Sequence, residues 1–380
     1  MRAHLLSWSE STGWSGADEA ADPQLVFYFG ARCDLQSGGR HRELQTLFPH
    51  ANVIGCSTGG QIRGSEVDDE IAAVALVFER TGVRVVHVET TDAAASFTCG
   101  RRIGEQLAAP DLAGIFVLSD GLHVNGSRLV EGIVSVVGRH VSLTGGLAGD
   151  GDAFDATIVG ANFAPRANVI AAVGFYGKAV RIGHGSAGGW DQFGPRRRVT
   201  LSSDNVLYEL DGEPALDLYE RYLGEEAEGL PSTALLFPLR IFDPAKPDDA
   251  IVRTVLAVDR RARSMTFAGD VPEGWMAQLM RGNFDRLAAG AATAARSAQA
   301  SFAGVAASGD ELALLVSCIG RRLLMGQSTV DEVEAAAGAL GAHVKRIGFY
   351  SYGEISPNDV SGVCQLHNQT MTITTISEAA

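Results

Sequence analysis

Two copies of one glycine-rich segment carry side chains that could react with or bind a ligand. The first, Gly55–Ile62, reads Gly-Cys-Ser-Thr-Gly-Gly-Gln-Ile, and the second, Gly348–Ile355, reads Gly-Phe-Tyr-Ser-Tyr-Gly-Glu-Ile. Both place a hydroxyl at the fourth position and follow a short apolar run. The first copy also matches Gly-x-Ser-x-Gly around Ser57, the pattern in which α/β-hydrolases present a nucleophilic serine. Ser57 is therefore one candidate for acyl transfer.

The residues after Ser57 favour a binding turn over a catalytic one. The hydrolase pattern requires a helix directly after the serine, whereas the chain continues Gly-Gln-Ile-Arg-Gly, a poor start for a helix. The second copy has Tyr350 at the position of the serine. The two copies thus share a backbone turn with a polar tip, which predicts ligand contacts by Ser57, Thr58 and Gly59 and no catalytic residue.

A third glycine-rich segment, Thr144–Asp150, could bind a charged group. Consecutive glycines let backbone N–H groups approach an anion closely, so Thr144, Gly145 and Gly146 are candidate contacts, with Asp150 as a counter-group for an amine. Neither a phosphate-loop lysine nor a helix-opening Gly-x-Gly-x-x-Gly follows. A tight turn before a strand near Ala156 explains the segment equally well.

Carboxylates and a histidine provide the remaining candidates. Asp120 and Glu354 could form an acid–base pair, and Glu354 lies near Tyr352, His367 and Asn368 in the chain. No His-Glu-x-x-His motif supports metal catalysis. A haem needs only one imidazole in an apolar cavity, which makes His367 the candidate metal ligand.

The last candidates lie in a segment with its own periodicity. Residues Gln365–Ile376 alternate amide, hydroxyl and apolar side chains, which predicts a strand with a polar face. We expect that face to line a pocket with Tyr352, Glu354, His367 and Asn368 as ligand contacts.

Strand, helix, strand units with a glycine-rich exit recur three times and indicate an α/β fold. Short β-branched runs between them predict antiparallel strands, as in residues 71–78, 83–89, 156–159, 169–176 and 180–183. The expected fold has mixed sheets with βαβ-like units and antiparallel strands, in two related domains with an internal pseudo-duplication. The polar stretch Gly224–Pro231 suggests domains of residues 24–222 and 223–376, and an alanine-rich helix is expected over residues 290–307.

Composition narrows the class of protein. A net charge of -14 in 380 residues argues against nucleic acid and anionic membranes as partners, because both are bound through basic patches. Five cysteines without Cys-x-x-Cys spacing fit reduced thiols better than disulfides or zinc. The apolar runs are too short for a membrane span. We expect a cytoplasmic protein.

These segments together resemble the FIST family of sensory proteins, which have a FIST N-terminal and a FIST C-terminal domain. The resemblance extends from about Leu25 over nearly the whole chain. It is carried by Gly55–Ile62, Leu118–Leu122, Leu143–Asp150, Tyr208–Tyr219, Ser317–Arg322, Gly348–Ile355 and Leu366–Ile373. It implies a signal-input module, not an enzyme, that binds small ligands such as amino acids.

Ser317–Arg322 and the last two segments resemble a subgroup of stand-alone bacterial members in particular. That resemblance implies binding of haem b and sensing of nitric oxide in a two-component system, through a partner sensor histidine kinase. A diguanylate cyclase or phosphodiesterase is the other partner that the family implies. No motif identifies the axial ligand, for which His367 and His123 are candidates. The alternatives are a sensor of amino acids or other small metabolites without haem, and a serine hydrolase at Ser57.

Overall fold

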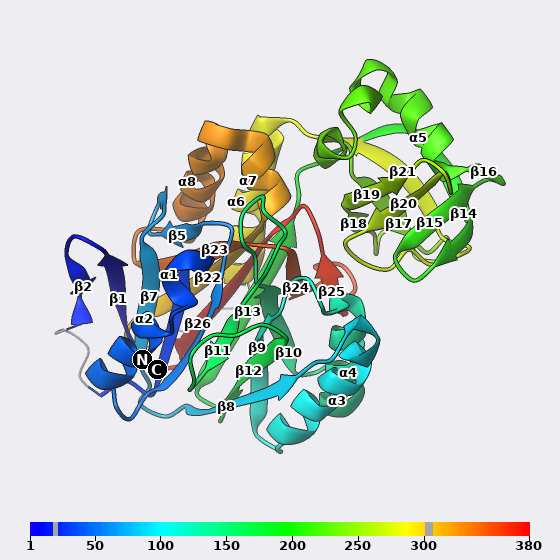
Figure 1. The fold of residues 1–380 in the computed structure, drawn as a ribbon. Coiled ribbons are helices and arrows are strands. Elements are labelled where there is room, and N and C mark those ends of the chain that lie inside the picture. The colour runs from blue at the N-terminus through cyan, green and yellow to red at the C-terminus, as the bar shows by residue number, and fades with distance from the viewer. Residues whose placement is uncertain (18–21, 301–306) are drawn as a thin grey trace.

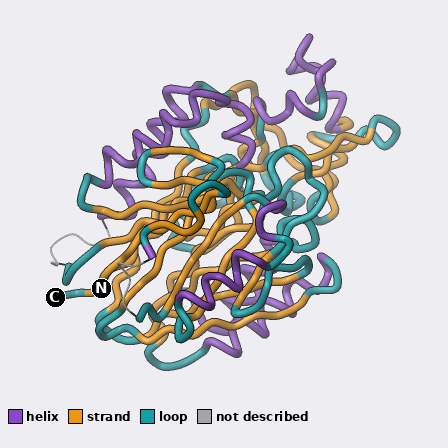
Figure 2. The backbone as a smooth tube through the Cα atoms, turned by 60° about the vertical axis from the view of Figure 1, so that its left-hand side comes forward, coloured by secondary structure: helices purple, strands orange, loops and turns teal. Residues whose placement is uncertain are grey.

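Three mixed β-sheets form the body of the protein, and a fourth sheet forms a separate lobe (Figure 1). The computed structural model describes residues 1–17, 22–300 and 307–380. Strands fill the middle of the body and helices lie on its outside (Figure 2). The predicted class, α/β with mixed sheets that contain βαβ units, is confirmed.

Each body sheet contains one pair of parallel strands joined by helices. The strands of these pairs are almost entirely buried, as continuous apolar runs predict. The first unit is β3 (Leu25–Gly30), α1 (Arg32–Leu35), α2 (Gly39–Leu47) and β4 (Asn52–Ser57); the second is β9 (Leu112–Ser119), α4 (Gly126–Val137) and β10 (Ser142–Leu147); the third is β22 (Glu311–Cys318), α7 (Ile319–Met325), α8 (Thr329–Leu340) and β23 (Val344–Ser351).

Antiparallel strands extend each sheet beyond its first parallel strand. They are β7 (Ile71–Val77), β1 (Arg2–Ser9) and β2 (Gly13–Ser15) in the first sheet, β12 (Val169–Tyr176) and β8 (Gly82–Glu89) in the second, and β26 (Met371–Glu378) and β13 (Val180–Ala187) in the third. The strands β1 and β2 precede the first element expected from the sequence. The amine of Met1 forms a buried ion pair with Glu378 at 2.9 Å, so the two chain ends meet (Figure 1).

On its other side, each sheet receives a strand from a different unit. After its second parallel strand, the chain leaves its sheet through a glycine-rich segment and pairs with the second parallel strand of another unit. The strand β5 (Gln61–Arg63) pairs with β23, and β6 (Glu66–Asp68) pairs with β5. The strand β11 (Val159–Ala161) pairs with β4. The strand β24 (Gly353–Pro357) pairs with β10, and β25 (Cys364–His367) pairs with β24. The internal repetition therefore comprises three units, and the glycine-rich segments are the crossovers between their sheets.

Small residues let the outer helices pack closely. The helix α3 (Ser96–Leu107) packs on α4, where a Cβ on Gly132 would collide with the carbonyl oxygen of Phe97. Alanines of α6 (Phe284–Ala300) pack against α8 and β13. The alanine-rich helix expected over residues 290–307 therefore begins six residues earlier, and residues 301–306 lie outside the described part of the chain.

Residues 191–281 form the lobe, which has its own sheet and core. Its elements are β14 (Asp191–Ser203), β15 (Val206–Leu210), β16 (Glu213–Pro214), α5 (Ala215–Leu223), β17 (Leu239–Phe242), β18 (Ile251–Arg253), β19 (Val255–Asp259), β20 (Ser264–Phe267) and β21 (Met276–Arg281). The domain boundary expected at residues 222 and 223 lies at the end of α5, inside the lobe.

Residues Gln365–Ile376 do not form the single strand that their alternation predicted. They contain the end of β25 and the start of β26, separated by a turn in which Gln369 has a φ of 58°. Periodicity fails here because the turn contains neither glycine nor proline, the usual local signals. The turn brings Asn368 to the edge of the body that borders the lobe.

Candidate functional site

The three glycine-rich segments meet where the sheets exchange strands. The N–H of Gly59 donates to the carbonyl oxygen of Tyr350 at 2.8 Å, and the N–H of Gly149 donates to that of Ser57 at 3.0 Å. A Cβ on Gly149 would lie 3.2 Å from the nitrogen of Gly59, so the missing side chain permits this close approach. Two cavities border the junction, and five of the expected site residues line one or the other.

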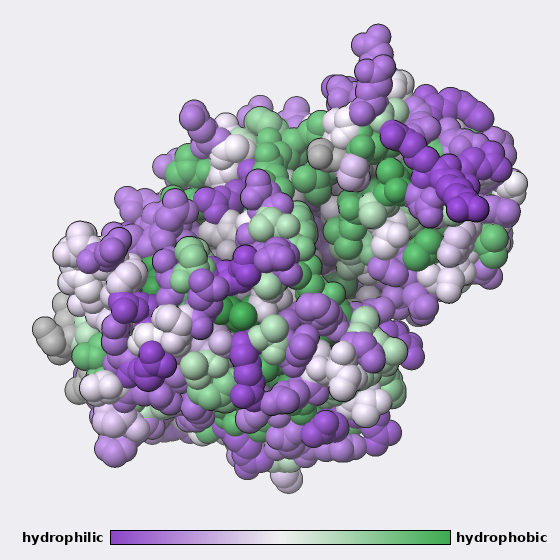
Figure 3. All heavy atoms as spheres, in the orientation of Figure 1, coloured by the Kyte–Doolittle hydropathy of each residue, from purple (hydrophilic) through white to green (hydrophobic). Residues whose placement is uncertain are grey.

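The first, called the lobe cavity, lies between body and lobe and has a volume of about 200 Å³. Apolar side chains gather where the lobe meets the body (Figure 3). Its wall includes Leu147, Ile319, Tyr352 and Asn368 from the body, and Asn205, Thr254, Leu256 and Phe267 from the lobe. Among the described residues no charged side chain lines it, so the cavity suits a ligand without net charge.

Two polar side chains in this wall have unmet hydrogen-bonding groups. Asn368 is 1% exposed, and neither its amide nitrogen nor its amide oxygen has a partner among the described residues. The same is true of the buried Thr254 hydroxyl, which comes from the lobe. Buried polar groups are nearly always hydrogen-bonded, and an unmet one costs about 1–3 kcal/mol. An unmet group on each wall indicates that a ligand or water completes these hydrogen bonds.

Tyr352 connects the lobe cavity to the second cavity. Its ring stacks on that of Phe154, with centroids 4.5 Å apart and an interplanar angle of 13°. Phe154 is partly exposed and also lines the lobe cavity. The Tyr352 hydroxyl donates to Asp150, whose carboxylate lies in the wall of the second cavity.

Thr58, Gly59 and Asp150 line this second cavity, called the arginine pocket because Arg32 and Arg322 enter it. Its volume is about 310 Å³. Burial alone would raise the pKa of Asp150, but hydrogen bonds from Tyr352 and from two backbone N–H groups, together with Arg32, hold it below its usual value. Asp150 is therefore an ionised group that the fold itself already satisfies.

Glu354 is fully buried beneath the turn that carries Asn368. Its carboxyl accepts hydrogen bonds from the hydroxyls of Ser351 and Thr370, both at 2.9 Å, and from the Thr370 N–H at 3.2 Å. Burial raises the pKa of Glu354 to about 8, although these hydrogen bonds and Arg321 favour the ionised form. It supports the turn and does not line either cavity.

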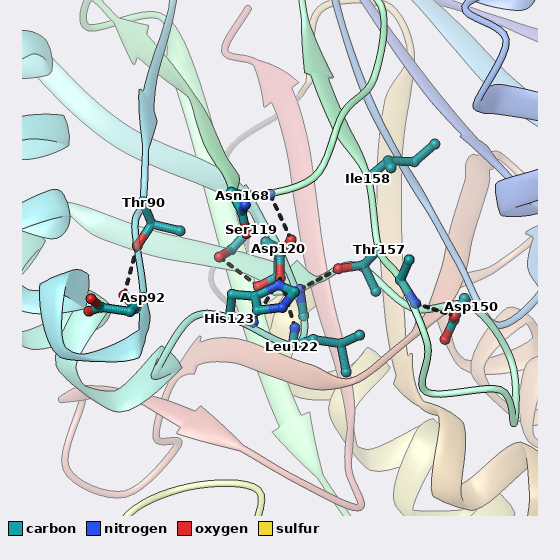
Figure 4. A network of polar contacts seen from close by, with 12 residues as sticks. Thr90, Asp92, Ser119, Asp120, Leu122, His123, Asp150, Thr157, Ile158 and Asn168 are labelled. Atoms are coloured by element: carbon teal, nitrogen blue, oxygen red, sulfur yellow. Dashed lines mark hydrogen bonds and ion pairs between the residues drawn. The ribbon is translucent and has the colours of Figure 1, made fainter.

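Asp120 fixes the backbone after β9. One carboxylate oxygen accepts the N–H groups of Leu122 and His123 and lies 3.2 Å from the Nδ1 of His123, and the other accepts the N–H of Asn168 (Figure 4). All four partners are supplied by the protein. The separate hydrogen bonds of Asp120 and Glu354 do not bring these carboxylates together as an acid–base pair.

Four further candidates hold strands together. The buried Ser57 hydroxyl accepts the N–H of Ile158 at 3.0 Å, and the strand β5 follows in place of the helix that a nucleophile elbow needs. Thr144, Gly145 and Gly146 lie within β10, where a Cβ on Gly145 would collide with the neighbouring strand. None of the four lines either cavity.

The surroundings of His367 do not fit a haem. Its Nε2 lies 2.9 Å from the carbonyl oxygen of Ser356, which only accepts, so Nε2 carries a proton and donates. Burial lowers the pKa of His367 to about 4, and the ring lines neither cavity. The lobe cavity is also smaller than the roughly 300–1,000 Å³ pockets that hold drug-sized ligands.

The described residues contain neither a metal-binding cluster nor a membrane-spanning helix. Within residues 1–17, 22–300 and 307–380, no group of three His, Cys, Asp or Glu side chains is placed to hold a metal ion. In the same residues, no helix is both long and apolar enough to cross a membrane.

Sequence reasoning missed Thr254, Phe154, Arg32 and Arg322. A threonine or phenylalanine in a loop carries no local signal of an unmet hydrogen bond or a stacked ring. Arg322 alone had a signal, because it ends the segment Ser317–Arg322 that contributes to the family resemblance.

An α/β body and a smaller lobe that share a partly polar cavity define a ligand-binding module. The family model of the FIST N domain matches residues 24–213, and that of the FIST C domain matches residues 215–357. The chain therefore belongs to the FIST family, whose domains are associated with signal transduction and the sensing of small ligands.

Individual proteins show more distant similarity. An uncharacterized protein of Methanocaldococcus jannaschii, MJ1623, is 31% identical over 190 residues, which are 46% of this chain and 35% of that protein. The chain thus matches about a third of the length of this relative. A cyanuric acid hydrolase from A. caulinodans is similar with a TM-score of 0.43 and 10% identity, over 100% of this chain and 99% of the other. PurLQS from Thermotoga maritima gives a TM-score of 0.22 and 10% identity, over 85% of this chain and 74% of the other.

Proposed function

We propose that this protein is a cytoplasmic sensor that binds a small, uncharged, polar ligand in the lobe cavity. The observation that carries the proposal is Asn368, a buried amide in the cavity wall whose donor and acceptor are both unmet. The reduced cysteines support the location, since no disulfide joins the five thiols, all of which lie in described residues. The signal passes to a partner protein, for which a sensor histidine kinase or a cyclic-di-nucleotide enzyme is proposed.

The chemistry of the wall limits the class of ligand. A carboxamide presents a donor and an acceptor side by side, so a lactam, a primary amide or a similar planar edge would satisfy both atoms of Asn368. The stacked pair of Tyr352 and Phe154 offers an aromatic surface for such a planar group. A free amino acid fits this cavity less well, because its two charges would find no counter-charge in the lining.

The turn that carries Asn368 also contacts the connections between body and lobe. The carbonyl oxygen of Gln369 accepts the Nε1–H of Trp190 at 2.6 Å, directly before the lobe begins. Arg321 donates to the carbonyl oxygen of Gly188, at 2.6 Å, in the segment that leads into the lobe, and to that of Leu287, at 2.9 Å, in the first turn of α6 after the lobe. A ligand on Asn368 can therefore shift the lobe position that a partner recognises, by the difference in its affinity for the two states.

Thermal unfolding with a defined panel tests the proposal. The panel contains lactams, primary amides, planar heterocycles and free amino acids, each added to the wild type and to Asn368→Leu. A ligand at about 100 times its Kd should add about 2.7 kcal/mol to the free energy of unfolding. We expect at least one uncharged member to stabilise the wild type and to lose that effect in Asn368→Leu.

A matched pair of variants provides the control. Thr254→Val and Ser377→Ala each remove a buried, unpartnered hydroxyl, but only Thr254 lines the lobe cavity. Ligand stabilisation should weaken in the first and persist in the second. Equal effects in both variants, or stabilisation that survives Asn368→Leu, would contradict the proposal. A Soret band on adding hemin that His367→Ala abolishes would replace it with a haem sensor.

The hydrolase alternative has a test of its own. A fluorophosphonate probe should leave Ser57 unlabelled, because its hydroxyl is buried and hydrogen-bonded. Labelling that Ser57→Ala abolishes would favour an enzyme.

A further inference from the structure

The arginine pocket has a different chemistry from the lobe cavity. It lies beyond the carboxyl ends of β3 and β4, and its volume of about 310 Å³ makes it the larger and more open of the two. Its two cations come from different units of the body, Arg32 from the first and Arg322 from the third. Their side chains are 32% and 30% exposed, so the guanidinium groups are partly desolvated but reachable.

Arg322 is held in a defined orientation. One of its terminal nitrogens donates to the carbonyl oxygen of Gly59, and its guanidinium lies over the ring of Tyr350, 5.6 Å from the centroid. Gly60 has a φ of 140°, and a Cβ there would collide with this guanidinium. The glycine-rich segment therefore holds the guanidinium of Arg322 in place. Some of the remaining N–H donors of this guanidinium face the pocket.

The carboxylates that now pair with the two arginines are mostly exposed. The Nη2 of Arg322 lies 3.6 Å from Asp69, whose side chain is 93% exposed, and the Nη2 of Arg32 lies 3.0 Å from the exposed Asp155. Exposed ion pairs of this kind contribute about 0–1 kcal/mol, so a ligand can replace them at little cost. A ligand carboxylate could accept two parallel N–H bonds from the guanidinium of Arg322, whereas Asp69 lies 3.6 Å from one nitrogen of that group.

Asp150 limits the charge that the pocket can accept. Its carboxylate is nearly fully buried, accepts hydrogen bonds from Tyr352 and the N–H groups of Asp155 and Ala156, and lies 3.9 Å from the Nε of Arg32. Arg32 thus offsets a fixed negative charge, and Arg322 remains as the cation with only an exposed partner. This balance favours a small anion with one carboxylate seated on Arg322.

We infer that the arginine pocket is a second ligand site, which binds a small organic carboxylate through Arg322 with support from Arg32. It does not depend on the lobe cavity for its chemistry, since none of the side chains that would contact the anion lines that cavity. The two sites are nevertheless connected by the hydrogen bond from Tyr352 to Asp150. They also share α7, in which Ile319 lines the lobe cavity and Arg322 lines the arginine pocket.

Alkylation of Cys33 reports on the pocket directly. Cys33 lines it and is the exposed cysteine, whereas Cys56, Cys99 and Cys318 are buried and Cys364 is partly buried. The rate of its reaction with iodoacetamide, an uncharged reagent, is measured on the full chain with acetate, malonate and succinate at constant ionic strength. We expect at least one carboxylate to slow the reaction fivefold or more in a saturable way, while malonamide does not.

Matched variants decide the outcome. Arg322→Gln should weaken protection of Cys33 at least tenfold, and Arg32→Gln should weaken it less. Arg322→Lys should give intermediate protection, because lysine keeps the positive charge but cannot donate two parallel hydrogen bonds to one carboxylate. Arg128→Gln removes an exposed arginine elsewhere and should change nothing. Melting curves confirm that each variant is folded, and Cys33→Ser identifies the reacting thiol.

Three results would overturn the inference: no protection by any carboxylate, protection that persists in Arg322→Gln, or equal protection by sulfate or inorganic phosphate. Failure of the lobe-cavity proposal is distinguishable, because it would appear in the thermal unfolding of Asn368→Leu and leave Cys33 protection intact.

Discussion

The lobe cavity and the arginine pocket border the same junction of glycine-rich segments, yet they differ in how their polar groups are satisfied. In the lobe cavity, the buried side chains of Asn368 and Thr254 have no partner within the described part of the chain, whereas in the arginine pocket every described charge has one. The backbone crossovers are alike, and the side chains beyond them decide the chemistry. A repeated backbone geometry therefore provides positions for ligands, and the local side chains select the ligand at each position.

Neighbouring residues in α7 show the same contrast. Arg321 is fully buried and pairs with Glu332, with its Nη2 2.7 Å from the carboxylate, whereas Arg322 is partly exposed and enters the arginine pocket. Glu332 also accepts the hydroxyls of Ser317, at 3.0 Å, and Tyr350, at 2.9 Å. One arginine thus holds the third unit together, and the next is available to a ligand.

The largest expected effect separates these two arginines. Arg321→Gln should lower the free energy of unfolding by about 3–5 kcal/mol, because it leaves the Glu332 carboxylate buried without its charged partner. Arg322→Gln should cost less, about 1–2 kcal/mol, since its ion pair is exposed and its hydrogen bond to the Gly59 carbonyl contributes about 0.5–1.5 kcal/mol. Urea unfolding of both variants measures the difference, and similar losses would show that Arg322 is also a structural residue.

A smaller effect should follow from cutting the link between the two cavities. Tyr352→Phe removes the hydrogen bond to the ionised Asp150 and should cost about 1.5–3 kcal/mol, near the lower end because two backbone N–H groups remain. Tyr219→Phe is the matched control, since the Tyr219 hydroxyl donates to a neutral carbonyl at 2.8 Å and should cost only about 0.5–1.5 kcal/mol. Equal losses of unfolding free energy in the two variants, measured in urea, would show that Tyr352 does not donate to an ionised Asp150.

The pH dependence of stability tests whether the Glu354 carboxyl beneath the Asn368 turn is uncharged in the folded protein. With its pKa raised to about 8, folded Glu354 keeps a proton that the unfolded chain has released, so its contribution to stability falls as the pH rises from about 4.5 to about 8. The fall is at most about 1.4 kcal/mol per pH unit. His367 acts in the opposite sense below pH 6.5, because burial lowers its pKa to about 4. The decline should therefore be clearest between pH 6.5 and 8.

Glu354→Gln provides the control for this titration. Unfolding free energies measured from pH 6.5 to 8 should become nearly flat in the variant, since glutamine has no proton to release. A decline that remains unchanged would assign the titration to another group and leave Glu354 ionised beneath the turn.

The smallest effect concerns the exposed acid of the arginine pocket. Asp69→Asn should change the free energy of unfolding by less than about 0.5 kcal/mol, as most exposed substitutions do. It should strengthen carboxylate protection of Cys33 by a few fold, because it removes the competing charge beside Arg322. Glu131→Gln, which frees the exposed Arg128, is the control and should leave protection unchanged.

The sequence determined much of the fold on its own. Apolar runs with glycine-rich exits located the three βαβ units, and the parallel strand pairs lie where those runs predict. Such signals are local, because burial on both faces requires an uninterrupted apolar strand. Five of the twelve expected ligand contacts line a cavity, and four of these, Thr58, Gly59, Asp150 and Tyr352, do so because they lie at or beside the strand exits.

Only the tertiary structure decided which residues share a cavity. The exchange of β5, β11 and β24 between sheets joins segments far apart in the chain, and no local pattern specifies such pairing. Asn368 lines the lobe cavity because a turn without glycine or proline interrupts its strand, and Thr254 reaches it from the lobe. A hydrogen bond left unmet, or an arginine left with only an exposed partner, depends on the whole set of neighbours. The duplicated segment therefore fixed the backbone of the sites, and long-range packing fixed their chemistry.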